Sequence, residues 1–251
     1  RPTVLGRRAE SFMFVPMAFS YENMGRDGKA LCLGETVLLQ EEANPFMSRL
    51  RKQGILVTAL HNHWLFDKPR LMYMHFESID EPLDFARKVR RAMGVLNLSD
   101  DGKGSRVLQG THNNAGAALC EEFHRILGGT HTFENGVCMV MRSRTNIMPR
   151  VLGRRGNSFL LIPQMFTFES LTPDGRALCS GETVILQEEI NPFISILRKH
   201  NILVTAFHNH WLFDQPRLMY IHWEKIDDPV AFARATREAL SVLTNRPVFP
   251  R

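Results

Sequence analysis

The 251-residue chain has no long hydrophobic run, no glycine-rich phosphate loop, no nucleophile elbow and no reactive-cysteine motif. A membrane-spanning helix needs about 20 consecutive apolar residues, so we expect none of the chain to cross a bilayer. Without a phosphate-binding loop or a nucleophile motif, nothing in the sequence identifies a substrate. An unknown small molecule or a polar polymer remains open as the substrate class.

The four cysteines form no CxxC pair. Cys32 and Cys179 occupy equivalent strand positions, whereas Cys120 and Cys138 lie in a unique middle segment. We expect buried free thiols, with a disulfide between the middle pair as the alternative.

The net charge is +5 and the pI is near 9.2, but basic residues are interleaved with acidic ones throughout. The cluster at Arg87, Lys88, Arg90 and Arg91 has no aromatic companions and is typical of a solvated helix face, so a nucleic-acid partner is not favoured. The chain begins at Arg1 without a methionine, which leaves a removed leader or domain open. Both a cytoplasmic and an exported location, and a homo-oligomer, stay open.

What the chain does have is an internal repeat. The string VLGRR at residues 4–8 returns at residues 151–155, an offset of 147 (151 minus 4), and the match extends to Val95-Leu96 and Val242-Leu243. This tandem duplication predicts two modules, residues 1–96 and 115–251, joined by a connection over residues 97–114. The longest blocks that the two copies share are GETV, LQEE, NPF, ILVTA, HNHWLFD and PRLMY.

Each repeat predicts the order strand, strand, helix, strand, strand, helix. This ββαββα order is a circular permutation of the ferredoxin-like plan, so we expect an α+β protein in which each module has an antiparallel sheet with helices on one face. Both faces of the hairpin strand at 55–66 are apolar, which favours two closely packed modules. The first copy predicts strands over 11–21, 29–40, 55–66 and 71–77, with helices starting at Asn44-Pro45 and near Asp80-Glu81-Pro82. The second module adds a predicted helix over 115–127 and a strand over 136–144.

Histidines recur at equivalent positions of the two copies: His61, His63 and His75, and then His208, His210 and His222. Strand periodicity places His61 and His63 on one face, and a hairpin symmetric about residue 68 pairs His75 with His61. Three converging imidazoles predict a metal site in each repeat, with zinc favoured and iron or manganese as alternatives. The competing interpretation is that these histidines only satisfy one another or the backbone.

Carboxylates could complete each metal site. Glu42 and Glu189 end the strand that precedes the Asn-Pro helix start, so we assign them as fourth ligands or as the acid-base group. Adjacent Glu41 and Glu188 point to the opposite face and are expected in solvent.

Other conspicuous residues receive structural roles. A regular strand would place Trp64 and Trp211 on the face opposite the histidines, where they are predicted to pack in a core or an interface. Arg70 and Arg217 are predicted to close the hairpin by pairing with Asp67 and Asp214, in preference to binding an anionic substrate. His112, His124, His131 and His200 lie outside the pattern and receive no role, and the contiguous string HNH does not reproduce the scattered residues of HNH nucleases.

At these residues the chain resembles the bacterial LppY/LpqO-like family, a domain of unknown function that is often duplicated. The motifs that carry the resemblance are Gly34 to Pro45, Val57 to His63 and Met72 to His75, with their second copies at Gly181 to Pro192, Val204 to His210 and Met219 to His222. The resemblance covers nearly the whole chain but implies no established activity. Because some relatives look like exported lipoproteins, it implies an extracytoplasmic location.

Three functions therefore stand as hypotheses. The first is a metal-dependent hydrolase in which Glu42 or Glu189 is a ligand or a base. The second is a non-catalytic module that binds a metal or a small ligand. The third is a metalloenzyme of redox, isomerase or lyase chemistry with paired modules around an enclosed metal, as in vicinal-oxygen-chelate proteins.

Overall fold

The computed structural model describes residues 1–97 and 114–250, so almost all of the predicted connection over 97–114 lies outside the described residues. The first module has two long strand pairs, each followed by a helix. Its elements are β1 (Thr3–Val4), β2 (Arg7–Arg8), β3 (Met17–Glu22), β4 (Ala30–Leu39), α1 (Gln40–Lys52), β5 (Leu56–His61), β6 (Leu71–Asp80) and α2 (Pro82–Met93).

The second module repeats this order and adds a helix with a strand hairpin in front of it. Its elements are α3 (Asn114–Leu127), β7 (Thr130–Glu134), β8 (Val137–Ser143), β9 (Arg150–Val151), β10 (Arg154–Arg155), β11 (Pro163–Glu169), β12 (Ala177–Ile185), η1 (Gln187–Glu189), α4 (Ile190–Lys199), β13 (Leu203–His208), β14 (Met219–Asp227) and α5 (Pro229–Leu240). The predicted extra helix and strand are thus present as α3 and β8, and β7 was not predicted.

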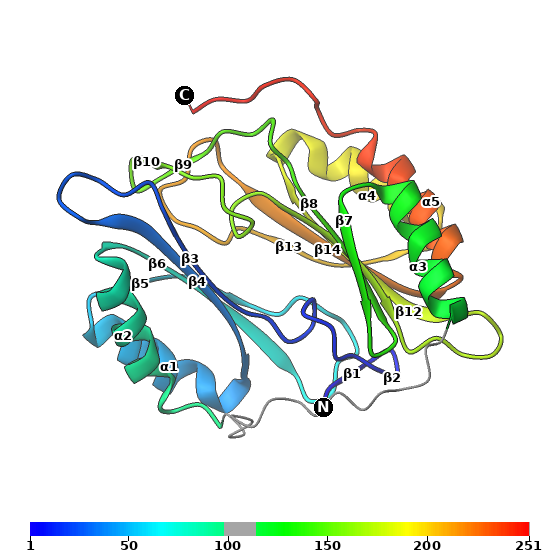
Figure 1. Ribbon diagram of the computed structural model, residues 1–251, viewed down its shortest axis with the longest axis horizontal. Helices are drawn as coiled ribbons and strands as arrows, with labels where there is room; N and C mark the ends of the chain where they lie inside the picture. Colours follow the sequence, from blue (N-terminus) through cyan, green and yellow to red (C-terminus); the bar gives the residue numbers. More distant parts are fainter. Residues whose placement is uncertain (98–113, 251) are drawn as a thin grey trace.

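Two antiparallel sheets face each other across the middle of the molecule. The first has the strand order β3-β4-β6-β5, and the second has the order β13-β14-β12-β11-β8-β7. Figure 1 shows α1 and α2 on the outer side of the first sheet and α3, α4 and α5 on the outer side of the second, so the layers run helix, sheet, sheet, helix. The architecture is a mixed α and β fold, and no described helix is long and apolar enough to span a membrane.

Apolar residues fill the space between the two sheets as well as the space under the helices. Leu31 and Leu33 of β4 pack with Val184 and Tyr220 of the other module, and Tyr73 of β6 packs in a cluster with Met165 and Leu178. Burial of this shared apolar area stabilises the contact between the modules, at about 25 cal/mol per Å². The prediction of two closely packed modules is consistent with this arrangement.

The shared GETV block follows from the packing of β4 and its counterpart β12. Gly34 lies under the ring of Phe76, which packs with α1 and α2, and a β-carbon at residue 34 would overlap that ring. Gly181 has the same relation to Trp223. Because side chains alternate along a strand, the glutamate that follows each glycine points away from the helices and into the space between the sheets.

Several predicted boundaries are wrong. Helix α1 begins at Gln40, not at Asn44-Pro45, because the Glu42 carboxylate accepts the main-chain N–H of Leu39 and so caps a turn further upstream. Strand β3 begins at Met17, six residues after its predicted start at residue 11.

The cysteine prediction holds for one pair only. Cys120 of α3 and Cys138 of β8 form a disulfide, so the expectation of free thiols is wrong for the middle pair. Cys32 and Cys179 are free and buried, as expected.

Candidate functional site

The first three histidines are presented by the β5-β6 hairpin. His61 is the last residue of β5, His63 follows in the loop, and His75 lies in the middle of β6. The predicted pairing of His61 with His75 is wrong, because the strands pair symmetrically about residue 67 and not 68, which places His61 opposite Tyr73 and Ala59 opposite His75. The three rings nevertheless meet, since the centroids of His63 and of His75 each lie 5.0 Å from that of His61.

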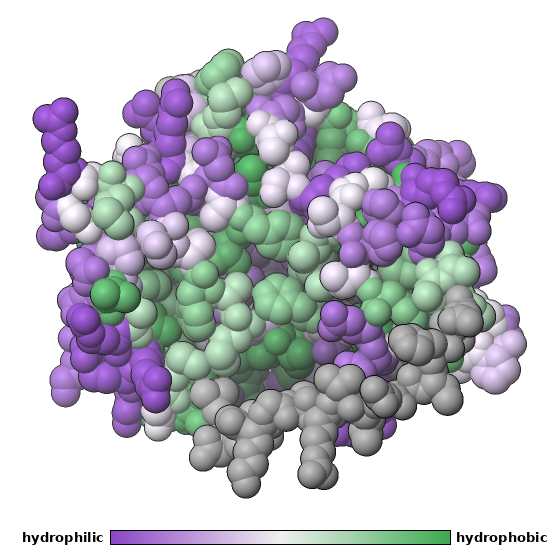
Figure 2. Space-filling view, viewed as in Figure 1, coloured by the Kyte–Doolittle hydropathy of each residue, from purple (hydrophilic) through white to green (hydrophobic). Residues whose placement is uncertain are grey.

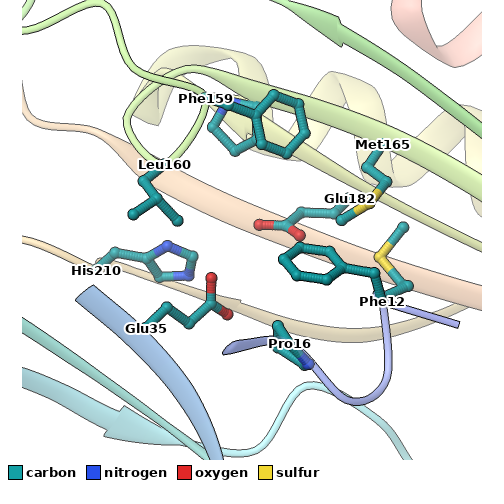
Figure 3. Close-up of a pocket in the computed structure, with 10 residues that line it drawn as sticks. Phe12, Pro16, Glu35, Phe159, Leu160, Met165, Glu182 and His210 are labelled. Carbon is teal, nitrogen blue, oxygen red and sulfur yellow. The ribbon is translucent and has the colours of Figure 1, made fainter. Parts of the chain in front are cut away.

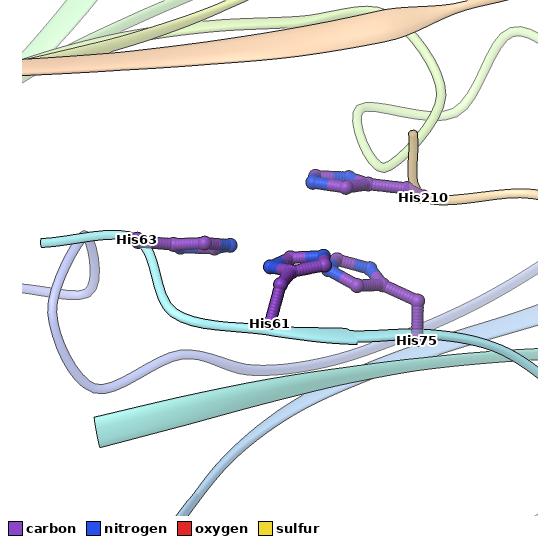
Figure 4. Close-up of side chains that lie close together, drawn as sticks. All are labelled: His61, His63, His75 and His210. Atoms are coloured by element: carbon purple, nitrogen blue, oxygen red, sulfur yellow. The ribbon is translucent and has the colours of Figure 1, made fainter. Parts of the chain in front are cut away.

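The two histidine triads form one cluster and not two separate sites. The rings of His61 and His208 stack at 3.5 Å, those of His75 and His210 at 3.7 Å, and those of His63 and His222 at 3.9 Å. Each of these pairs joins the two modules. Figure 4 shows His210 approaching His61, His63 and His75 from the opposite side of the cluster. The prediction of one site per repeat therefore gives way to a composite site between the sheets.

Within this cluster, two sets of four histidines could each hold one metal ion, with ligand atoms no more than 4.8 Å apart. The sets are His61, His63, His75 and His210, and His63, His208, His210 and His222. They are related by the repeat, because each contains one complete triad and the central histidine of the other. His63 and His210 belong to both sets.

Most of the ring nitrogens in the cluster are buried without a hydrogen-bond partner. They are both nitrogens of His61, His75, His208 and His222, and Nε2 of His63 and His210. Burial lowers the pKa of all six histidines, that of His208 to about 4, and neighbouring histidines lower several of them further. Neutral imidazoles with free lone pairs are suited to bind zinc, copper or iron. Buried polar atoms without a partner are costly, so they require a ligand or water.

Neighbouring side chains fix the two shared histidines. The ring of Tyr73 stacks on His63 at 3.6 Å, and Tyr220 stacks on His210 at 3.6 Å. The hydroxyl of Thr205 donates to the carbonyl oxygen of His63 at 2.6 Å, and that of Thr58 donates to the carbonyl of His210 at 2.5 Å. Each module therefore holds the backbone of the other module's shared histidine.

The tryptophans are buried, as predicted, but they also touch the site. Trp64 lies edge-on to His222 and Trp211 edge-on to His75, with centroids 5.5 Å apart in both cases. They were expected on the opposite face from the histidines. The regular strand ends at His61 and His208, so alternation does not continue to the tryptophans.

Two carboxylates that the sequence analysis did not select lie beside the cluster. In the pairing of β4 with β6, Glu35 lies opposite His75, and its Oε1 is 4.0 Å from Nε2 of that histidine. In the second module, Glu182 lies opposite His222 in the pairing of β12 with β14. Burial raises the pKa of Glu35 to about 8. Burial also raises the pKa of Glu182, and the charge of Glu35 raises it further. The signal that could have identified both residues is the acidic residue inside the shared GETV block.

A pocket opens onto these carboxylates. Its walls are mainly apolar and come from both copies, with Phe12 and Phe159 as equivalent residues. Figure 3 shows Glu35 and Glu182 approaching the same space from the two sheets, with His210 beside them. In the view of Figure 2, apolar residues gather in the middle of the molecule between more hydrophilic flanks. The pocket thus combines an apolar wall, two acids and an imidazole.

Glu42 and Glu189, the predicted carboxylate ligands, are absent from both histidine sets. The carboxylate of Glu42 accepts the main-chain N–H groups of Leu39 and Asn97, at 2.8 and 2.9 Å. Glu189 accepts both guanidinium nitrogens of Arg144 as well as the N–H of Leu186. These hydrogen bonds at the helix starts occupy the lone pairs of both carboxylates. The assignment of Glu42 and Glu189 as metal ligands, which rested on their place beside a helix start, is therefore not supported by their contacts.

Arg70 and Arg217 close their hairpins through ion pairs, as predicted. Arg70 pairs with Asp67 and Arg217 with Asp214, both at 2.8 Å. The buried carboxyl group of Glu77 in the first module faces Asp214 of the second. Burial and the negative charge of Asp214 raise the pKa of Glu77 to about 8.

The fold and the site together define an α and β protein with two facing antiparallel sheets and a histidine cluster between them. A family model described as Domain of Unknown Function (DUF1259) matches residues 1–95 and 121–242, and the chain belongs to this family. The match in two regions agrees with a duplicated domain of unknown function. No curated protein matches the chain significantly.

Three solved structures align over most of the chain, and two of them are described as trimeric shell proteins of bacterial microcompartments. A double ringed trimeric shell protein from the RMM microcompartment has 13% identity and a TM-score of 0.21, and covers 91% of this chain and 94% of its own. EtuB from Clostridium kluyveri has 8% identity and a TM-score of 0.22, with 98% and 100% covered. The trimeric shell protein PduB has 12% identity and a TM-score of 0.21, with 99% and 92% covered. At these scores the likeness carries no argument about this chain.

Proposed function

We propose that this protein binds one divalent transition-metal ion between its two modules, held by four of the six clustered histidines. The observation that carries the proposal is the set of buried ring nitrogens without hydrogen-bond partners, contributed by both modules. Imidazole nitrogens suit zinc, which we favour, and also iron, while manganese fits this nitrogen-rich set less well.

The expected stoichiometry is one ion per chain. His63 and His210 belong to both sets of four, and each offers a single ring nitrogen to the ion. Two ions would have to share these nitrogens, so filling one set leaves the other incomplete. This replaces the expectation of one ion in each repeat.

The chemistry that fits the pocket best is hydrolysis of a small substrate. A bound zinc ion would supply Lewis acidity to a water or a substrate oxygen, which requires the ion to take a fifth ligand or to leave one of the four histidines unbound. Glu35 and Glu182 face the same pocket. Burial raises the pKa of both carboxyl groups, that of Glu35 to about 8, so each is suited to receive or return a proton. Phe12 and Phe159 lie in the wall of this pocket and would exclude bulk water from the carboxylates.

A non-catalytic metal-binding role is the second candidate. Four histidines complete a tetrahedral zinc shell, which is the pattern of a closed structural site and leaves no position for substrate. A third role, redox, isomerase or lyase chemistry at an enclosed iron, draws on the position of the site between paired modules. Oxygen-dependent turnover by an iron-loaded protein would distinguish it from hydrolysis.

The first experiment is elemental analysis of untagged protein, purified without chelators and passed over a chelating resin to strip weak surface sites. We expect one ion per wild-type chain and none in His63→Ala or in His210→Ala, since each variant removes a ligand from both sets. His200→Ala is the matched control, because His200 is an exposed histidine that pairs with Glu238. No metal in folded wild-type protein under any loading condition would overturn the proposal.

Catalysis is tested separately from binding. Glu35→Gln and Glu182→Gln should keep the ion but lose turnover of chromogenic esters, by about 100-fold or more if the carboxyl group transfers a proton. Glu41→Gln, at an exposed residue of α1, serves as the control. Wild-type metal content with no turnover of any ester or amide substrate would favour the non-catalytic role.

We further infer that each module follows a circularly permuted ferredoxin-like plan. The first sheet's order β3-β4-β6-β5 is the one that this permutation generates, and the second module contains the same order as β11-β12-β14-β13. The quoted motifs also support the narrower LppY/LpqO-like relationship and, with it, an extracytoplasmic location. The disulfide between Cys120 and Cys138 fits such an oxidising compartment.

A further inference from the structure

A second group of metal-binding side chains lies on α3 and β7, which have no counterpart among the described residues of the first module. Helix α3 carries Glu121 and His124, three residues apart and therefore on one face, and β7 carries His131. One ligand atom from each residue lies within 4.8 Å of the others, and the two imidazole rings stack at 4.3 Å. No residue of this group belongs to the central cluster.

The hydrogen bonds of the group leave a lone pair free for a ligand. Nε2 of His124 lies 2.9 Å from the carbonyl oxygen of Gly129, and only a protonated nitrogen makes that bond. Nδ1 of His124 then carries the lone pair, and this atom is buried without a hydrogen-bond partner. A carbonyl that orients a histidine through its other nitrogen is the usual arrangement around a ligating imidazole.

The remaining two residues complete a three-ligand set. Nε2 of His131 lies 3.1 Å from Oε2 of Glu121, and Nδ1 of His124 lies 3.8 Å from Oε1 of the same carboxylate. Each imidazole therefore directs a nitrogen toward one carboxylate that is about half exposed to solvent. Two histidines with one carboxylate bind zinc or iron and leave the other coordination positions to water.

We propose that Glu121, His124 and His131 form a second site for a divalent transition metal, independent of the central cluster, which clamps α3 to β7. The disulfide between Cys120 and Cys138 already joins α3 to β8, so the ion would provide the second link between this helix and its hairpin. The first module has no corresponding helix or hairpin among its described residues. Within the described part of the chain, the site therefore belongs to the second module.

The test is hydrogen-deuterium exchange of the full-length chain over residues 114–134, with and without added zinc sulfate. We expect zinc to slow exchange in this segment, and His131→Ala or His124→Ala to abolish the effect. Glu121→Gln keeps the size of the side chain and should weaken the zinc response by at least about tenfold in concentration. Unchanged exchange in wild-type protein, or an unchanged zinc response in His131→Ala, would overturn the proposal.

Two controls assign the effect to this site. His200→Ala removes an exposed histidine that pairs with a single glutamate, so the zinc response over 114–134 should remain as in wild type. His63→Ala removes a ligand from both central sets and should also leave this response intact. Because the central cluster is tested by retained metal and this group by local exchange, either proposal can fail without the other.

Discussion

Strands β3 and β11 occupy equivalent places in the two modules but have different surroundings. In the first sheet β3 is an edge strand, and Phe19 on it is 44% exposed. In the second sheet β8 pairs with β11 and α3 packs on the outer face, so Phe166, the counterpart of Phe19, is fully buried. The same residue type at the same repeat position can thus contribute differently to stability.

The surfaces that the modules turn toward each other show the opposite behaviour. Thr58 and Thr205 make equivalent hydrogen bonds to the opposite module, and Tyr73 and Tyr220 stack on equivalent histidines. The two copies are therefore alike where they meet and unlike where they face outward. We expect paired substitutions to have equal effects at the centre and unequal effects at the periphery.

The largest expected effect is an all-or-none loss of metal at the centre. His61→Ala does not change the set that contains His208, and His208→Ala does not change the set that contains His61. Each single variant therefore keeps one complete set and should retain one ion. The double variant leaves neither set complete and should retain none. Elemental analysis after the chelating resin measures this, and complete loss in either single variant would mean that the two sets are not interchangeable.

Removal of a phenylalanine ring should affect stability differently in β11 and in β3. Phe166→Ala should lower the free energy of unfolding by about 3–5 kcal/mol, because it leaves a cavity in a packed core. Phe19→Ala should cost less than about 1 kcal/mol, since much of that ring is already in water. Chemical denaturation followed by circular dichroism compares them, and equal costs would show that β3 is covered in solution.

The helix starts offer a second unequal pair. Glu189→Gln leaves the buried guanidinium of Arg144 without its charged partner and should cost about 3–5 kcal/mol. Glu42→Gln removes one of two main-chain hydrogen bonds and should cost about 1 kcal/mol. Both are measured by urea denaturation. Loss of metal from either folded variant would restore these glutamates as ligands and contradict their placement as caps.

The smallest expected difference is between two equivalent substitutions at the centre, which should have equal costs. Thr58→Val and Thr205→Val keep the shape of the side chain but leave the carbonyl oxygen of the opposite module's shared histidine without its donor. Each should cost about 1–3 kcal/mol, because the group is buried. The two costs should agree within about 0.5 kcal/mol, the usual scatter between independent sites. Thr36→Val, at a buried threonine whose hydroxyl bonds only its neighbour's carbonyl, is the control.

Local features of the fold could be predicted because their physical causes are local. The duplication, the β5-β6 hairpin, helix α3 and the convergence of His61, His63 and His75 all follow from repeat spacing and periodicity. The register of the hairpin did not follow, because the turn sequence does not fix the residue on which the hairpin is centred, and moving that centre by one residue changes every cross-strand pair.

The composite nature of the site could not be read from the sequence. His61 and His208 are far apart in the chain, and nothing in either repeat indicates which face of its sheet meets the other module. Glu42 was selected for its place beside a helix, although its carboxylate is used by that helix. Glu35 is the only acidic residue of its GETV block, but nothing in the block indicates that its side chain faces the second module.

The reciprocal bonds of Thr58 and Thr205 have a consequence for the origin of the protein. A contact in which each partner gives the other the same group is the mark of an isologous interface, as in a twofold homodimer. Fusion of two such subunits into one chain would keep the contact and free the outward faces to diverge. A single repeat expressed alone would then be expected to recover its missing half by dimerising.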